Sequence, residues 1–208
     1  MNEYWDKEWK NAKISEYEKY INPNGNPKFF DILKKHDISY VCDAACGFGA
    51  YSVMLNNSGY KTAGFDISEH SVNLTKDILK YFGCNSDNYK VCSITNIDFD
   101  DESFDAVVAH AVIDHLSSED AKRALDEIFR ITRKDGLIYI SFDGIEEDDI
   151  NMAHEVLEDG SFLYSDETRK GLLFKHYSED DIKELTIGKE QVYFNITKKG
   201  DRELILKK

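Results

Sequence analysis

Strand-like and helical segments alternate along the middle hundred residues of this chain, and this alternation restricts the possible folds more than any other feature. Apolar runs bounded by turn residues predict strands at 40–45, 61–65, 89–92, 104–109 and 137–142. Helical spacing of apolar residues predicts helices at 50–57, 68–82 and 118–131. Short apolar strands separated by helices indicate a parallel sheet covered on both faces. We therefore expect a doubly wound α/β fold.

The segments on either side of this core have different patterns. Residues 1–27 form an arm that ends in a cluster of turn formers at 22–27, and a short amphipathic helix is expected at 27–36. The core extends over 28–142, and an acidic segment dotted with aromatic residues follows it at 143–189. Residues 190–208 predict an antiparallel hairpin. Together these segments predict one domain around a mainly parallel seven-stranded sheet.

Composition excludes several classes of protein. Asp and Glu outnumber Lys and Arg by 40 to 26, so the formal charge of -14 disfavours nucleic acid as a partner. The four cysteines show no paired metal-binding spacing, and we expect free thiols and no metal site. No stretch resembles a signal peptide or a membrane-spanning helix, which favours a cytoplasmic protein with no membrane partner. The sequence contains no signal for an oligomeric state.

Two glycines follow the first predicted strand, in the stretch from Asp43 to Ala50. Gly47 and Gly49 allow a sharp turn and a close approach of the backbone to a ligand, while the next helix presents unpaired N–H groups. An ordinary strand-to-helix turn without a ligand remains the alternative. The loop predicts a ligand site at this edge of the sheet.

Asp66 ends the second predicted strand, 23 residues after Asp43. An acidic residue at about this separation is placed to accept hydrogen bonds from ribose hydroxyls. It could also cap the helix that begins near Ser68. Loop and acid together predict a nucleoside ligand.

The pattern Asp43-x-x-x-Gly47-x-Gly49 resembles the first motif of class I S-adenosylmethionine-dependent methyltransferases. A dehydrogenase would carry a third glycine, where this chain has Ser52. The resemblance extends over about residues 40–142 and implies S-adenosylmethionine as the cofactor. It implies that Asp43 helps to hold the methionine ammonium through the loop, and that Asp66 binds the ribose diol.

The rest of the cofactor site follows from the same resemblance. Ser93 stands where many relatives carry an acid that accepts from the adenine amine, and Ile94 would lie against the base or belong to the core. His110 lies in the segment that faces the methionine end of the cofactor. The cofactor-binding residues are therefore expected to be Asp43, Ala44, Ala45, Gly47, Gly49, Asp66, Ile67, Ser93, Ile94 and His110.

The acceptor would bind beside the segment after the fourth strand, because ligands of open α/β sheets bind at the carboxyl ends of the strands. His110 and His115 are candidate bases, although a lone histidine is more often a packed or surface residue. Residues 143–189 occupy the place of acceptor-binding insertions in relatives. The candidate acceptor-binding residues are Asp114, His176, Tyr177 and Trp5.

A small-molecule methyl acceptor is the expected substrate. A non-catalytic cofactor-binding module that serves a partner protein, and a dinucleotide-dependent oxidoreductase, are the alternatives.

The arm at 1–27 is expected to close over the cofactor as a lid. Trp5 and Trp9 are four residues apart and would share one face of a helix. The competing interpretation is therefore a helix packed permanently on the flank of the sheet.

Overall fold

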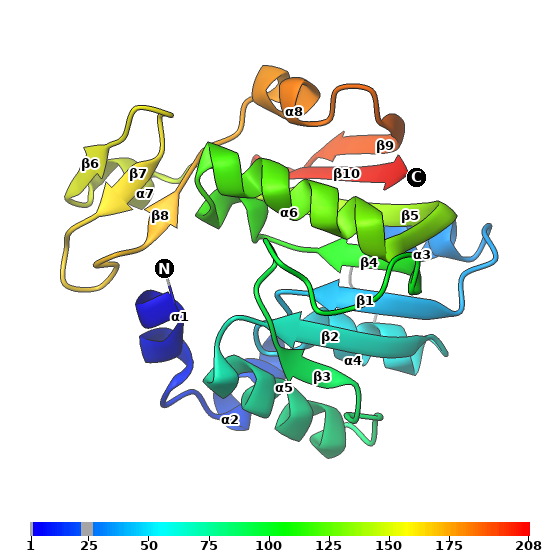
Figure 1. Ribbon diagram of the computed structural model, residues 1–208. Helices are drawn as coiled ribbons and strands as arrows, with labels where there is room; N and C mark the ends of the chain where they lie inside the picture. The colour runs from blue at the N-terminus through cyan, green and yellow to red at the C-terminus, as the bar shows by residue number, and fades with distance from the viewer. Residues whose placement is uncertain (1, 22–26) are drawn as a thin grey trace.

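The computed structural model describes residues 2–21 and 27–208, and a seven-stranded sheet forms its centre (Figure 1). The strand order is β3-β2-β1-β4-β5-β10-β9. Strands β1 to β5 run parallel, and β10 pairs antiparallel with both β5 and β9. The strands are β1 (Tyr40–Ala44), β2 (Lys61–Asp66), β3 (Tyr89–Val91), β4 (Phe104–Ala109), β5 (Thr132–Phe142), β9 (Glu190–Ile196) and β10 (Arg202–Lys207). This sheet confirms the predicted doubly wound fold and its antiparallel C-terminal hairpin.

Helices cover both faces of the sheet. Successive residues of each strand point to opposite faces, so apolar side chains on both faces are buried against helices. On β1, Cys42 packs in the cluster that contains α6 (Ser118–Ile131) and α8 (Glu179–Leu185). Val41 packs on the other face with α3 (Pro27–Leu33) and α4 (Ala50–Asn57). Helix α5 (Glu69–Tyr81) contributes a third cluster beside α4. The apolar residues of the predicted strands therefore pack on both faces of the sheet and form the core.

The helix ends follow the polar residues that the sequence places there. The Ser117 hydroxyl accepts a hydrogen bond from the Asp120 N–H at 3.1 Å at the start of α6. Ser178 and Asp181 form a reciprocal capping box at the start of α8. These bonds satisfy backbone N–H groups that have no partner inside the helix.

Strand β5 and helix α3 differ from the sequence-based expectation. β5 begins at Thr132, five residues before the predicted start, and its register with β4 shifts between Phe104 and Ala106. Asp135, which precedes the predicted strand, lies in this irregular part of the strand with a φ of 61°. Helix α3 ends at Leu33, not at residue 36. The irregular strand start shows that a turn-like sequence can be accommodated inside a paired strand.

The segment 143–189 contains a small antiparallel sheet that was not expected from the sequence. Its strands are β6 (His154–Val156), β7 (Phe162–Tyr164) and β8 (Leu173–Phe174), in that order, and α7 (Glu147–Asn151) precedes them. The acidic run at 146–149 forms the N-cap and first turn of α7, where carboxylates favour the positive end of the helix dipole. Its last member, Asp149, is buried and pairs with Arg169 at 2.5 Å. We call this segment, 143–189, the insertion.

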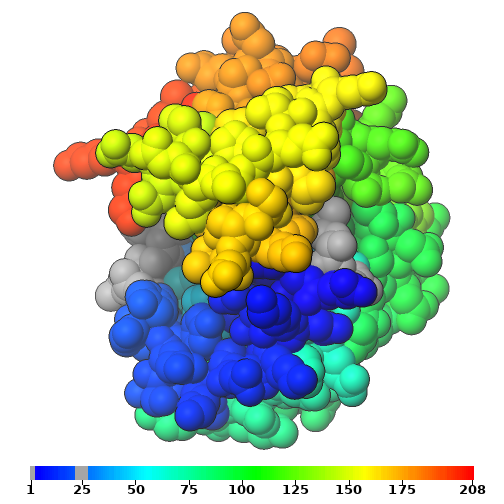
Figure 2. Space-filling model, turned by 90° about the vertical axis from the view of Figure 1, so that its left-hand side faces the viewer, coloured from blue at the N-terminus to red at the C-terminus, as the bar shows by residue number. Residues whose placement is uncertain are grey.

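The chain begins with α1 (Asn2–Trp9), α2 (Ile14–Tyr17) and the short η1 (Glu18–Tyr20). The predicted turn cluster at 22–27 lies outside the described residues, except for Pro27, which starts α3. Figure 2 shows α1, in dark blue, directly beneath the yellow and orange insertion. Tyr4 and Trp5 pack against buried Tyr164 and Phe174 of the insertion. The two parts of the chain that flank the core in sequence thus meet on one face.

All four cysteines are free thiols, as expected, and Cys42, Cys46 and Cys92 are buried. Within the described ranges, 2–21 and 27–208, no helix has the length and apolar character needed to cross a membrane.

Candidate functional site

A cavity of about 440 Å³ opens at the carboxyl ends of β1, β2 and β4, beneath α1. This edge is where parallel α/β sheets bind ligands, because loops and helix N-termini converge there. The lining residues come from the arm, the glycine loop, the ends of β2 and β3, and the segment after β4. They are Trp5, Trp9, Asp43, Ala45, Cys46, Gly47, Phe48, Ala50, Tyr51, Phe65, Asp66, Ile67, Cys92, Ser93, Ile94, Thr95, His110, Ala111, Val112, His115, Leu116 and Asp120.

The glycine loop leaves β1 through three residues with positive φ: Ala45 at 57°, Gly47 at 54° and Gly49 at 82°. A Cβ on Gly49 would lie 2.9 Å from the Cγ2 atom of Thr75. Both this close approach and the positive φ disfavour any side chain at this position. The Thr75 hydroxyl also donates a hydrogen bond to the Gly47 carbonyl at 2.7 Å. Helix α5 thus holds the loop in the shape that exposes its backbone to the cavity.

Asp66, at the end of β2, connects the loop with the start of α5. One carboxylate oxygen accepts from the Gly47 N–H at 3.0 Å, and the other accepts from the Ser68 N–H at 3.0 Å. Burial raises the pKa of this carboxyl group, while the two N–H donors oppose the shift. Each oxygen has a second lone pair, so the group can still accept a ligand hydroxyl. The helix-capping interpretation and the ligand interpretation of Asp66 are therefore compatible.

Asp43 lies on the face of β1 that is covered by α4. Its carboxylate accepts a hydrogen bond from the Ser52 hydroxyl at 2.5 Å. Burial raises the pKa of Asp43 to about 7, although the bonds from Ser52 favour the charged form. The charge at the base of the loop consequently changes near neutral pH.

Ser93 and Ile94 lie just after β3 and line the cavity, as does Ile67 after β2. The Ser93 and Thr95 hydroxyl groups share a hydrogen bond of 2.9 Å. Ile94 is 7% exposed and belongs to the core cluster beneath α6. The Ile94 side chain therefore belongs to the core and also forms part of the cavity wall.

His110 follows β4 and faces the cavity, where its ring lies 4.9 Å from the Tyr51 ring, centroid to centroid. The surrounding protein lowers the pKa of His110 by desolvation, even though the ring is accessible through the cavity. Nearby Asp114 and Glu203 oppose this shift. His110 is therefore favoured as the neutral imidazole at pH 7.

His115 ends the short helix η2 (Ile113–His115) and forms part of the cavity wall. Its Nδ1 lies 3.0 Å from the Leu173 carbonyl oxygen in β8. Because a carbonyl can only accept, Nδ1 carries the proton, which leaves Nε2 unprotonated in the neutral ring. The Trp5 ring meets His115 edge to face at 5.1 Å between centroids.

Trp9 reaches the other end of the same wall. Its ring lies 6.4 Å from that of Phe48 in the glycine loop, and Gly47 lies directly beneath it. Helix α1 therefore covers the cavity with both of its tryptophans, one over the loop and one over His115.

Five of the predicted site residues do not line the cavity. Ala44 and Gly49 shape the loop from behind it. Tyr177 is buried against Phe142, with ring centroids 4.7 Å apart, and His176 lies beside Arg202 and Asp181. Asp114 is fully buried and accepts from the Asp143 N–H at 2.9 Å. The structure thus places the three predicted acceptor-binding residues of this group behind the wall of the cavity.

Asp114, His115 and Asp143 also form the one group of potential metal ligands in the described part of the chain, with ligand atoms within 4.8 Å of one another. Burial raises the pKa of Asp143 to about 6, and the neighbouring Asp114 adds to the shift. The sequence had indicated no such group, because Asp143 is 29 residues from Asp114.

Sequence reasoning missed several lining residues, among them Phe48, Tyr51, Leu116 and Asp120. Phe48 and Tyr51 could have been inferred, since they lie in the glycine loop and the first turn of the helix that follows it. Leu116 and Asp120 surround the start of α6, and no motif marks them as ligand-facing.

Comparison with known proteins agrees with this geometry. A family model described as a methyltransferase domain matches residues 42–140. The tRNA (carboxymethyluridine(34)-5-O)-methyltransferase of Arabidopsis thaliana is 30% identical over 115 residues, which cover 55% of this chain and 26% of that protein. The matched region thus spans about a quarter of that curated relative.

Solved structures extend the likeness to nearly the whole chain. A protein from Pyrococcus horikoshii superposes with a TM-score of 0.77 at 19% identity, covering 95% of this chain and 92% of that one. A SAM-dependent methyltransferase from Methanosarcina mazei gives a TM-score of 0.73 at 24% identity, covering 88% and 97%. At these identities the two structures establish a shared fold.

Proposed function

We propose that this chain is a class I S-adenosylmethionine-dependent methyltransferase, since residues 42–140 match the methyltransferase-domain model, and that it transfers the cofactor's methyl group to a small-molecule acceptor. The observation that supports this most is the shared cavity, which brings the glycine loop, Asp66 and the segment after β4 to one place. A cofactor bound along the loop would present its methyl group toward His110 and His115.

The residues of the cavity fit the parts of S-adenosylmethionine. Asp66 would accept from the ribose hydroxyls, with Ser93 and Ile94 beside the adenine. The loop from Ala45 to Gly49, supported by Asp43, would hold the methionine ammonium, and the N–H groups at the start of α4 would face its carboxylate. The carboxylates also favour the positive sulfonium electrostatically.

The bound cofactor supplies an electrophilic methyl group on sulfur, so the protein supplies alignment, exclusion of water and, for some acceptors, a base. Trp5 and Trp9 cover the cavity with apolar surface that excludes water. His110 and His115 are the two candidate bases, each able to accept a proton on an imidazole nitrogen in its neutral form.

A small acceptor is favoured by the closed shape and the charge of the molecule. Helix α1, which lines the cavity with Trp5 and Trp9, also meets the insertion (Figure 2), and the formal charge of the chain is -14. The charge opposes the binding of a long phosphate backbone. A nucleoside within tRNA is the second candidate, because the Arabidopsis relative is a tRNA methyltransferase.

The test is the formation of S-adenosylhomocysteine by the purified chain from S-adenosylmethionine, with either a fractionated metabolite extract or total tRNA as acceptor. We expect product with a metabolite fraction and none with tRNA. The D43A/D66A double variant is the matched control that should lack both binding and turnover. Product only with tRNA would replace the small-molecule proposal. Binding of the cofactor without turnover on either pool would instead assign a non-catalytic module.

A further inference from the structure

The described wall of the cavity carries three carboxyl groups and neither a lysine nor an arginine. The carboxyl groups are those of Asp43, Asp66 and Asp120. The residues outside the described ranges, which are Met1 and the stretch 22–26, contain no lysine or arginine either. An anionic group that entered this cavity would therefore meet carboxyl groups and no lysine or arginine on the described wall that could pair with it.

Lys175 of the insertion is engaged in hydrogen bonds outside the lining of the cavity. The Lys175 ammonium donates to the Ser118 hydroxyl at 2.7 Å and to the Asp159 carbonyl at 2.9 Å. These bonds hold the insertion against the start of α6. Lys175 is thus held away from the cavity.

The N-terminus of α6 could also attract an anion, since its unpaired N–H groups carry partial positive charge. The protein fills this position with its own carboxylate. Asp159 accepts from the Ser118 N–H and from the Ser118 hydroxyl, both at 2.9 Å. The pKa of Asp159 is lowered by these hydrogen bonds, as expected for an anion held in such a place.

Aromatic rings form much of the remaining wall. Trp5 meets His115 at 5.1 Å, and Tyr51 meets His110 at 4.9 Å, between ring centroids. The faces of tryptophan and tyrosine attract cations and pack on flat apolar rings. Asp120, on the first turn of α6, adds a carboxylate to the same region of the wall, and one of its oxygens pairs with the Arg123 guanidinium, which does not line the cavity.

We propose that the methyl acceptor is a flat, largely apolar molecule that is neutral or positively charged, and that acceptors bearing a carboxylate or phosphate near the reacting atom are rejected. This inference rests on the proposed function, because it assigns the aromatic end of the cavity to the acceptor. It identifies acceptor chemistry by charge and shape: a heteroaromatic ring, a phenol or an aromatic amine fits the wall.

Three probes of one ring system test this inference: 1-naphthylmethylamine, 1-naphthalenemethanol and 1-naphthoate. Their dissociation constants are measured by calorimetry on protein saturated with S-adenosylhomocysteine. We expect the amine and the alcohol to bind at least about tenfold more tightly than the carboxylate, which corresponds to the cost of one uncompensated charge near others. Equal or tighter binding of 1-naphthoate would overturn the inference.

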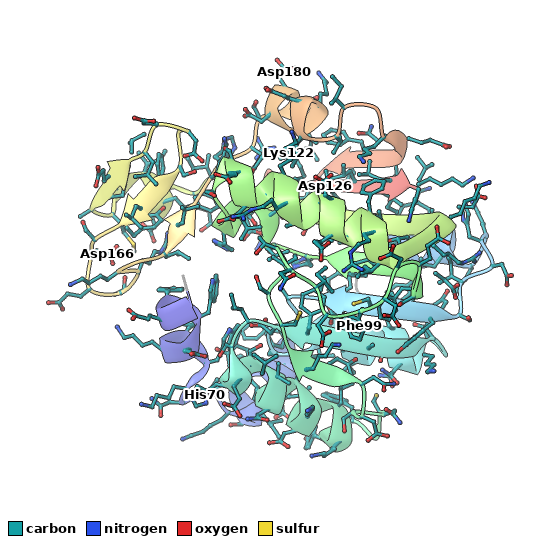
Figure 3. The ribbon with its side chains drawn as sticks, in the orientation of Figure 1. His70, Phe99, Lys122, Asp126, Asp166 and Asp180 are labelled. Carbon is teal, nitrogen blue, oxygen red and sulfur yellow. The ribbon has the colours of Figure 1, made fainter. Side chains whose placement is uncertain are left out.

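Two matched variants locate the effect on α6. Asp120→Asn should reduce the preference for the amine over the alcohol, because it removes the carboxylate at the cavity wall and takes away the ion-pair partner of Arg123. Asp126→Asn makes the same change at an exposed position of the same helix, labelled in Figure 3, and should leave the preference unchanged. If none of the probes binds while S-adenosylhomocysteine does, the acceptor class is wrong. If S-adenosylhomocysteine itself fails to bind, the proposed function fails instead.

Discussion

The Asp66 carboxylate at the end of β2 accepts a hydrogen bond from the Gly47 N–H, 3.0 Å away, in the loop that follows the neighbouring strand β1. The residue expected to hold the ribose therefore also fixes the loop expected to hold the methionine end. We therefore expect binding of the cofactor and order in the loop to be coupled through this one side chain.

Substitution of Asp66 should consequently affect two properties at once. Asp66→Ala removes the acceptor for the Gly47 and Ser68 N–H groups, which should cost roughly 1–3 kcal/mol of folding stability. It should also weaken binding of S-adenosylhomocysteine by about tenfold or more, because charge-assisted hydrogen bonds to the ribose are lost. Urea unfolding and calorimetry measure the two effects.

Asp77→Ala is the matched control, since this aspartate is exposed on α5 and pairs with Lys80 at the surface. It should change neither quantity by much. If Asp66→Ala lowers stability but leaves the affinity unchanged, Asp66 supports the loop alone.

S-adenosylhomocysteine should stabilise the folded chain. A ligand that binds only the folded state adds about 2.7 kcal/mol at a hundredfold excess over its Kd. For a domain of this size we expect a rise in Tm of roughly 5–11 °C. NADH is the control ligand, because a dehydrogenase would respond to it. No shift with millimolar S-adenosylhomocysteine, or a larger shift with NADH, would contradict the cofactor assignment.

The core of the fold could be predicted because its signals are local. Strand runs between turn residues and the capped helix at Ser118–Ile131 agree with the structure within a few residues. The glycine loop and Asp66 were recognisable because strand, loop and acid follow one another in sequence. They reach the same cavity through the parallel pairing of β1 with β2, which is a general property of this fold.

The insertion could not be predicted in the same way. Strands β6 to β8 have only two or three residues each, too few to show a period of two. Tyr177 was expected at the acceptor, yet its ring fills the space beside Phe142 in the core. A sequence shows which residues suit a binding site, but an aromatic side chain suits a core equally well. Only the packing of distant elements decides between them.

Gly49→Ala should destabilise the chain more than Gly59→Ala. Both glycines have positive φ, 82° and 90°, so both substitutions strain the backbone. Only at Gly49 would the new Cβ also approach Thr75, with the nearest atom 2.9 Å away, whereas nothing lies within 4 Å at Gly59. We expect an additional loss of about 1–3 kcal/mol for Gly49→Ala, measured by urea unfolding. Equal losses for the two variants would show that Thr75 moves aside without cost.

The pKa of Asp43 gives the chain a specific dependence on pH. Its folded-state pKa of about 7 lies above the usual value of 3.8, so between these values the folded state holds a proton that the unfolded state has released. The contribution of Asp43 to stability therefore falls as pH rises from about 4 to 7, and it stays constant above that window. At about 1.4 kcal/mol per pKa unit, the loss amounts to a few kcal/mol.

The measurement compares the wild type with Asp43→Asn, which cannot titrate but still offers an acceptor to the Ser52 hydroxyl. The difference in free energy of unfolding between the two proteins should shift in favour of the variant as pH rises through this window. Other carboxyl groups cancel in the difference because both proteins carry them. A difference that is flat between pH 4 and 7 would show that Asp43 ionises normally in the folded state.

The last prediction concerns α1, which we propose to be a lid that tightens on the bound cofactor. Its Trp5 and Trp9 are the only two tryptophans of the chain, both are partly exposed, and both line the cavity. Trp9 contacts the loop that should hold the cofactor, and Trp5 contacts His115. A ligand between these contacts would add packing surface under α1 and favour the closed arrangement.

Acrylamide quenching of tryptophan fluorescence tests this, with Trp5→Phe and Trp9→Phe each leaving a single reporter. We expect S-adenosylhomocysteine to lower the quenching constant of both reporters, because a closed lid shields them from the quencher. A helix packed permanently on the flank would give the same protection with and without ligand. Equal quenching in the two states, in protein shown by calorimetry to be saturated, would therefore reject the lid and leave α1 as a fixed wall of the cavity.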